Sequence, residues 1–75
     1  MQRAIETELT HRQSAVVQFI RDYAEIHAGS PSLREIASWL GITPQGTMRH
    51  IDALERKGRI TRARGQHRSI VAVDK

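Results

Sequence analysis

A glutamine and an arginine stand four residues apart at Gln45 and Arg49, in a segment that also holds a glycine and a methionine. A glutamine amide can form two hydrogen bonds with an adenine edge, an arginine guanidinium can do so with a guanine, and a methionine can contact a thymine methyl group. A glycine allows close approach of the backbone. This chemistry indicates five candidate base-reading residues: Thr43, Gln45, Gly46, Met48 and Arg49. The alternative interpretation is an ordinary solvated helix face.

Positive charge is concentrated at the C-terminal end of the chain. The net charge is +4, but residues 1–55 sum to −2, from five Arg against seven acidic residues, and residues 56–75 sum to +6. An arginine-rich cluster favours binding to a polyanion, because guanidinium groups match phosphate geometry and are drawn to a narrow minor groove. The alternative is a surface whose charge serves solubility. The candidates for contacts with a nucleic-acid backbone are Ser32, Arg34, Asp52, Arg56, Arg62, Arg64, Gln66, His67 and Arg68.

Three helices are expected to position these side chains. Thr10 and Ser32 each stand three residues before a Gln or a Glu, which is the spacing of a capping box. Thr43 precedes a proline, and proline fits the first helical position because its missing N–H costs nothing there. The predicted helices span residues 11–28, 33–40 and 44–57, and each ends before a glycine.

The periodicity of these helices separates buried faces from exposed ones. In the first helix the apolar stripe consists of Val16, Val17, Ile20, Tyr23 and Ala24. In the third helix the inward face consists of Thr47, Ile51 and Leu54, and the opposite face of Gln45, Arg49, Asp52 and Arg56, with Met48 at its edge. We therefore expect the third helix to present a row of long polar side chains to a partner.

The pattern after Gly58 is typical of β structure. Residues 60–63 and 69–73 are β-prone and flank a glycine-containing loop, which predicts a hairpin. The predicted fold class is mainly α with a small β part: a winged helix-turn-helix, in which three helices precede a two-stranded β-hairpin wing. Residues 1–8 show no period and are interpreted as an N-terminal tail, leaving one domain over residues 9–75. In helix-turn-helix units the second helix lies in the major groove.

Several classes of protein lack a signal in this sequence. The chain has no cysteine and four scattered histidines, so we expect no metal site and no cofactor. No phosphate-binding glycine loop or catalytic motif is present, so we expect neither an enzyme nor a small-molecule ligand. The longest apolar run is four residues, Ile70–Val73, against the roughly 20 that a membrane span needs. We expect a cytoplasmic protein that is associated with the nucleoid when bound to DNA.

Several motifs together resemble the N-terminal DNA-binding domain of the LexA repressors, over residues 9–73. The motifs are Leu9–Gln13, Phe19–Asp22, Pro31–Ala37, Leu40–Gly41 and Leu54–Ile60. The resemblance implies a winged helix-turn-helix that binds operator DNA in the major groove, with the wing against the backbone or minor groove. It places base reading at the start of the recognition helix, on the five candidate residues given above.

The sequence departs from the LexA pattern at three points. The segment between Gly41 and His50 is one residue shorter than is usual, and Met48 and Arg49 differ from the residues typical of the family. We therefore do not expect the LexA operator sequence. LexA repressors also carry a C-terminal Ser/Lys self-cleaving domain, which these 75 residues do not contain.

The main hypothesis is a sequence-specific regulator that binds double-stranded DNA, of a repressor-like bacterial or phage type, with residues 44–57 as the recognition helix. A homodimer on a two-fold operator is the favoured arrangement, because a single small module binds DNA modestly. The alternative is a small winged-helix module for protein interaction, an anti-repressor or adaptor, which would use the surface around Trp39 and Met48.

Overall fold

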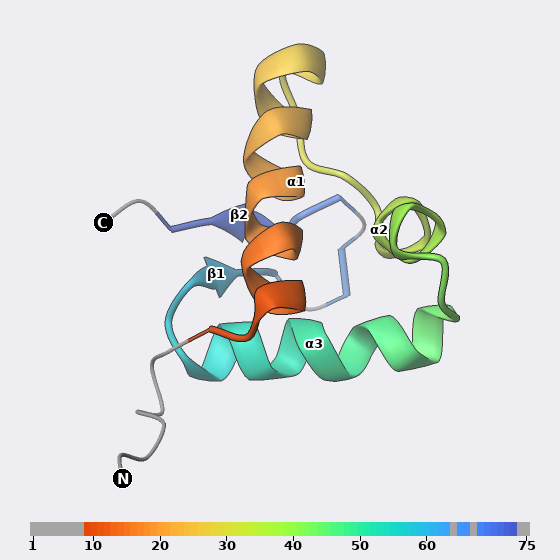
Figure 1. The fold of residues 1–75 in the computed structure, drawn as a ribbon. Coiled ribbons are helices and arrows are strands. Elements are labelled where there is room, and N and C mark those ends of the chain that lie inside the picture. The colour runs from red at the N-terminus through yellow and green to blue at the C-terminus, as the bar shows by residue number, and fades with distance from the viewer. Residues whose placement is uncertain (1–8, 64, 67, 74–75) are drawn as a thin grey trace, which may run out of the picture.

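The computed structural model describes residues 9–63, 65–66 and 68–73. The predicted tail over residues 1–8 and the candidate residues Arg64 and His67 lie outside the described residues. The elements follow in the order α1 (His11–His27), α2 (Leu33–Leu40), α3 (Pro44–Arg56), β1 (Ile60–Thr61) and β2 (Val71–Ala72). Figure 1 shows α1 crossing the small sheet, α3 beneath it and α2 to one side. Three helices followed by an antiparallel strand pair confirm the predicted winged helix-turn-helix.

The helix starts are those that the capping residues predict. The Thr10 hydroxyl accepts a hydrogen bond from the Gln13 N–H, and the Gln13 side chain accepts one from the Thr10 N–H. Ser32 and Glu35 form the same reciprocal pair at the start of α2. Each capping box satisfies backbone donors that a helix otherwise leaves without partners, so α1 and α2 begin at defined residues.

Helix α1 ends in a way that the sequence did not indicate. A glycine was expected to end it, but Ala28, one residue earlier, takes the left-handed conformation with φ of 55°. The Ala28 N–H donates to the Ala24 carbonyl and so closes the last turn. Between α2 and α3 the expectation holds, because Gly41 has φ of 76° and its N–H donates to the carbonyls of Ala37 and Ser38. A glycine adopts that backbone conformation without strain, which permits the tight turn.

The core lies where the three helices and the hairpin meet. Thr47, Ile51 and Leu54 on α3 are fully buried, as the periodicity predicts. On α1 the buried stripe stops at Ile20. Tyr23, predicted in the apolar stripe, is half-buried, whereas Ala24 is exposed, so its predicted inward place is wrong. The reason is that the last turns of α1 project beyond the elements that cover its first half (Figure 1). The core cluster consists of Val16, Val17, Ile20, Ile36, Ile51, Leu54, Ile60 and Ile70.

The hairpin is present but its strands are shorter than residues 60–63 and 69–73. Ile60 pairs with Ala72 and Thr61 with Val71. The same register would place Ala63 opposite Ser69, but there the Ser69 hydroxyl accepts from the Ala63 N–H and donates to the Ala63 carbonyl, both at 3.0 Å. A side chain thus takes the place of a backbone pair, and the regular ladder ends early.

No helix in the described part of the chain is both long and apolar enough to cross a membrane. The same residues contain no group of three or more His, Cys, Asp or Glu side chains placed to hold a metal ion.

Candidate nucleic-acid interface

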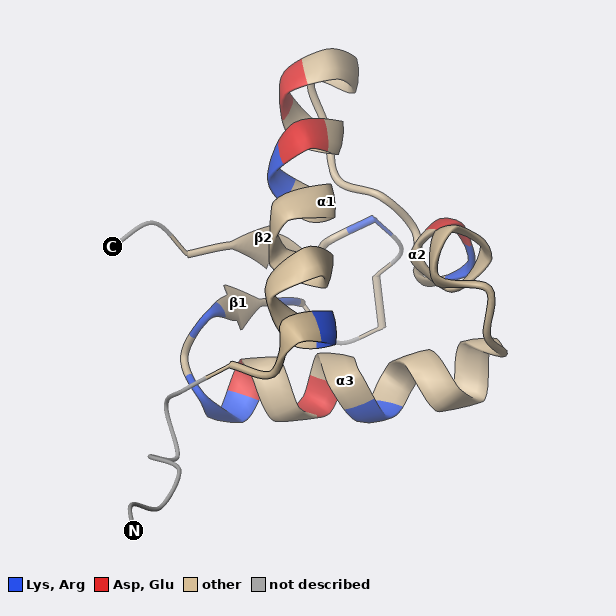
Figure 2. Cartoon of the chain, in the orientation of Figure 1, with Lys and Arg blue, Asp and Glu red and all other residues tan. Residues whose placement is uncertain are grey.

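The start of α3 follows the helix-turn-helix turn and carries the candidate base-reading residues. Gln45 and Arg49 are exposed there, one turn apart, and Asp52 and Arg56 continue the exposed row toward the end of the helix. Figure 2 shows basic segments in the middle and at the C-terminal end of α3 and on the connection to β1. The structure therefore brings together the row of polar side chains that the periodicity predicts.

Thr43 and Gly46 also have structural roles at the start of α3. The Thr43 hydroxyl accepts from the Gly46 N–H at 3.0 Å and caps α3. A Cβ added at Gly46 would lie 3.3 Å from the Thr43 hydroxyl oxygen and 3.7 Å from Ile42 Cδ1. Because the first distance is tighter than most real Cβ contacts, a side chain at position 46 would press on the cap. Glycine at position 46 thus avoids crowding the Thr43 cap and leaves the surface of the first turn of α3 without a side chain at this point.

Ser32 and Arg34 lie at the start of α2, the first helix of the helix-turn-helix. The Ser32 hydroxyl accepts from the Glu35 N–H at 3.1 Å, so Ser32 is occupied as a cap. Arg34 is exposed. Backbone N–H groups at a helix start favour an anion, and here the Glu35 carboxylate accepts from the Ser32 N–H at 2.8 Å.

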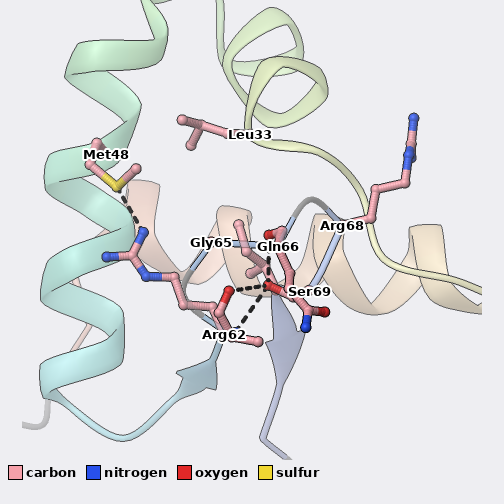
Figure 3. Close-up of a pocket in the computed structure, with 9 residues that line it drawn as sticks. Leu33, Met48, Arg62, Gly65, Gln66, Arg68 and Ser69 are labelled. Atoms are coloured by element: carbon pink, nitrogen blue, oxygen red, sulfur yellow. Dashed lines mark hydrogen bonds between the residues drawn. The ribbon is translucent and has the colours of Figure 1, made fainter.

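Arg62, at the end of β1, turns toward α3 rather than outward. Its Nη2 lies 2.8 Å from the Asp52 carboxylate and its Nε 3.3 Å from the Glu55 carboxylate. Its Nη1 donates to Met48 Sδ at 3.0 Å, and the Arg62 side chain is only 15% exposed. In Figure 3 the Arg62 and Met48 side chains meet across the gap between the wing and α3. The contact with Glu55 is an ion pair without hydrogen-bond geometry, since Nε has no hydrogen-bond partner among the described residues.

Arg68 turns the opposite way, toward α2. Its guanidinium donates to both Glu35 carboxylate oxygens, at 2.9 and 3.1 Å, and to the Tyr23 hydroxyl at 2.9 Å. The bonds from Arg68, together with the backbone bond from Ser32, lower the pKa of Glu35 from 4.5 to about 2. The same carboxylate raises the pKa of Arg68 above its usual value. Figure 3 shows Arg68 extending away from Arg62, so the two arginines attach the loop between the strands to different helices.

A hollow of about 240 Å³ lies between α3, the start of α2 and the loop of the wing. Met48 and Arg62 line it on one side, and Leu33 and Ile70 line it as well. Gln66 lines the same hollow and is exposed. Arg64 and His67 belong to this loop by sequence but lie outside the described residues.

Sequence reasoning did not find the acidic partners of the two wing arginines. Glu35 was interpreted only as part of a capping box, and Glu55 was not singled out. Met48, Asp52 and Glu55 do share the i, i+4, i+7 spacing of one helix face. That spacing is the one signal that could have indicated a common partner, but it does not say which arginine provides it.

An aromatic cluster packs α1 against α2. The Trp39 ring stacks on Phe19 with centroids 4.7 Å apart, and Phe19 also contacts Tyr23 at 6.0 Å. Trp39 remains 50% exposed in spite of this stacking.

The family model for the LexA DNA-binding domain matches residues 6–69 of the chain. The chain belongs to this family. It is 52% identical over 67 residues to the LexA repressor of Geotalea uraniireducens, a match that covers 88% of this chain and 33% of that protein. It is 47% identical over 66 residues to the LexA repressor of Thermosipho africanus, covering 88% and 33%. It is 44% identical over 63 residues to the LexA repressor of Thermotoga maritima, covering 84% and 32%. This LexA-type chain thus spans about a third of the length of these curated relatives.

Proposed function

We propose that this LexA-type domain binds double-stranded DNA in a sequence-specific way as the reader of a transcriptional repressor, with the first turns of α3 in the major groove. The observation that supports it best is the pair Gln45 and Arg49, exposed one turn apart at the start of the second helix of a helix-turn-helix. Among the described residues the Arg49 guanidinium forms no ion pair and the Gln45 amide no side-chain hydrogen bond, so both are available to base edges.

The proposed roles follow from the surroundings of each residue. Gln45 and Arg49 form bidentate hydrogen bonds with bases, and Met48 contacts a thymine methyl group. Gly46 allows close approach, and Thr43 supports the turn as the cap of α3. The contacts with the DNA backbone come from exposed side chains on either side of this surface, Arg34 and Arg56, and from the N-terminus of α2 at Ser32. The exposed Gln66 is a further candidate for a backbone contact from the wing, as are Arg64 and His67, which belong to the same loop by sequence.

A LexA-type reader of this size is proposed to act as a homodimer on a two-fold site. One such module buries about 600–1,000 Å² on DNA, and specific affinity usually requires two half-sites about 34–36 Å apart. Sedimentation with and without a selected DNA site measures the stoichiometry. A single domain bound to a non-repeating site would contradict the dimer and leave base reading intact.

The decisive experiment is selection of bound sequences from a random DNA library, followed by gel shifts on the selected site and on random DNA. We expect Arg49→Ala to lose about 1–3 kcal/mol of preference for the selected site, because Arg49 is proposed to read a base. Arg56→Ala should weaken binding to all DNA and reduce the slope of log affinity against log salt by about 0.9, as expected of one phosphate contact. The absence of DNA binding at about 50 mM salt, where electrostatic attraction is strong, would refute the proposal.

A second candidate function has one observation in its favour. Trp39 is 50% exposed and Ile26, near the end of α1, is 75% exposed, and exposed large apolar side chains are common at protein interfaces. A domain that retained a protein partner after nuclease treatment, and showed no affinity for DNA, would be a protein-interaction module.

A further inference from the structure

Two hydrogen-bond acceptors and a second carboxylate on α3 converge on one wing arginine. Met48, Asp52 and Glu55 follow each other on one side of α3, and each lies against a different nitrogen of Arg62: Sδ against Nη1 at 3.0 Å, Oδ1 against Nη2 at 2.8 Å and Oε1 against Nε at 3.3 Å. Every nitrogen of the guanidinium therefore faces the helix. With the Arg62 side chain 15% exposed, little of this group is open to a phosphate.

The acidic groups on α3 need such a counter-ion. The Asp52 side chain is 50% exposed and the Glu55 side chain 31% exposed, and Asp52 stands in the exposed row between Arg49 and Arg56. A carboxylate that approaches DNA phosphates is repelled, because like charges brought together across an interface are strongly unfavourable. Arg62 lies against both carboxylates and holds Asp52 on the side of α3 that faces the wing. The outward side of the helix is then occupied by Arg49 and Arg56.

The same arginine fixes the methionine. A methionine side chain has three rotatable bonds and adapts to many surroundings, so an exposed methionine discriminates poorly between partners. Met48 is half-buried, and its sulfur accepts a hydrogen bond from Arg62. The contact selects one direction for the end of the side chain at the edge of the reading surface (Figure 3).

We propose that Arg62 is a positioning residue for base recognition: it holds Met48 and Asp52 in their reading arrangement and does not itself bind a phosphate. This inference rests on the proposed function of α3 as the DNA reader. It assigns Arg62 a part in sequence discrimination, although its position in the wing indicates a backbone contact.

The test compares Arg62→Gln and Arg62→Lys with a matched control, Arg56→Gln, which removes an exposed arginine from α3. For each variant, affinities are measured by gel shift on the selected site and on random DNA over a range of salt concentrations. Urea unfolding confirms that each variant is folded. We expect both Arg62 variants to lower the ratio of specific to random affinity at least fivefold, because glutamine lacks the charge and lysine cannot contact Met48, Asp52 and Glu55 at once. Arg56→Gln should lower both affinities and leave the ratio within about twofold, as expected of a phosphate contact.

A second readout needs no DNA. Met48 is one of two methionines in the chain, so its methyl resonance can be followed directly by NMR. We expect it to shift in both Arg62 variants and to stay in place in Arg56→Gln. An unchanged Met48 resonance in both Arg62 variants would overturn the inference by itself.

The DNA measurements separate the remaining outcomes. If Arg62→Lys binds like the wild type while Arg62→Gln weakens binding to both DNAs equally, with a salt slope smaller by about 0.9, Arg62 is a phosphate contact and the inference is wrong. Unchanged affinities in both variants would overturn it as well. Failure of the wild-type domain to bind any DNA would instead refute the proposed function, and the Met48 resonance would still decide whether Arg62 positions that side chain.

Discussion

Replacing Ser69 with alanine should loosen the wing without disturbing the helices. The Ser69 hydroxyl joins the two arms of the hairpin, since it accepts from the Ala63 N–H and donates to the Ala63 carbonyl, each at 3.0 Å. These two contacts extend a sheet that has only two residues in each strand. Alanine keeps the backbone and Cβ and removes only the hydroxyl, so both contacts with Ala63 are lost at once, together with the contact from the hydroxyl to the Gln66 carbonyl at 3.2 Å.

The expected loss in the free energy of unfolding follows from the number and surroundings of these hydrogen bonds. A hydrogen bond inside a protein contributes about 0.5–1.5 kcal/mol net, and both of these lie in an exposed region where water can replace the hydroxyl. We therefore expect Ser69→Ala to lower the free energy of unfolding by about 1 kcal/mol, toward the low end for two bonds. For a domain of this size that corresponds to a fall in Tm of about 4–8 °C.

The assay combines urea unfolding with amide hydrogen exchange. Exchange at the Ala63 amide should accelerate by more than fivefold, because the hydroxyl that accepts its hydrogen bond is removed, while the amides of α1 and α3 accelerate at most about fivefold, the equivalent of the global loss of about 1 kcal/mol. Ser69→Thr is the matched control, because it retains a hydroxyl on the same atom. The reasoning fails if Ser69→Ala is as stable as the wild type with Ala63 exchange unchanged, or if Ser69→Thr is as damaging as Ser69→Ala.

Two further predictions concern the core and the contact between the wing and α2. Leu54→Ala should lower the free energy of unfolding by about 2–5 kcal/mol, because Leu54 is fully buried in the core cluster, and urea titration against an exposed-site control such as Ser38→Ala measures the loss. A loss below about 1 kcal/mol would mean that the core closes around the cavity. The folded-state pKa of Glu35 is about 2 against an ordinary 4.5, so its stabilising effect is complete above pH 4.5 and disappears as the pH falls toward 2. Between pH 5 and pH 2 the Tm of the wild type should therefore fall more than that of Arg68→Met, in which the largest cause of the shift is absent; equal falls would contradict the contribution of this ion pair.

Much of the fold could be predicted because the signals are local. The capping boxes at Thr10 and Ser32 and the proline after Thr43 define the helix starts, since a side chain that satisfies an N–H three residues away needs only its own neighbours. The helical periodicity of apolar and polar residues on α3 likewise predicted its buried and exposed faces. The error at Ala24 lies where neighbouring elements decide burial. Ala24 continues the apolar stripe of α1 but is exposed, since the last turns of the helix project beyond the elements that cover its first half (Figure 1).

The candidate site also has features that the sequence predicts and others that only the tertiary structure decides. The sequence by itself determined which side chains form the outward row of α3 and that positive charge gathers in the wing, because both properties belong to residue type and helical spacing. The tertiary structure alone decided what the wing arginines contact. Arg62 meets residues of α3 that lie 7 to 14 positions away along the chain, and Arg68 meets Glu35 across 33 positions. Such pairings depend on how the hairpin folds back onto α2 and α3. For this reason two arginines of the same type and charge, six residues apart, attach the wing to two different helices.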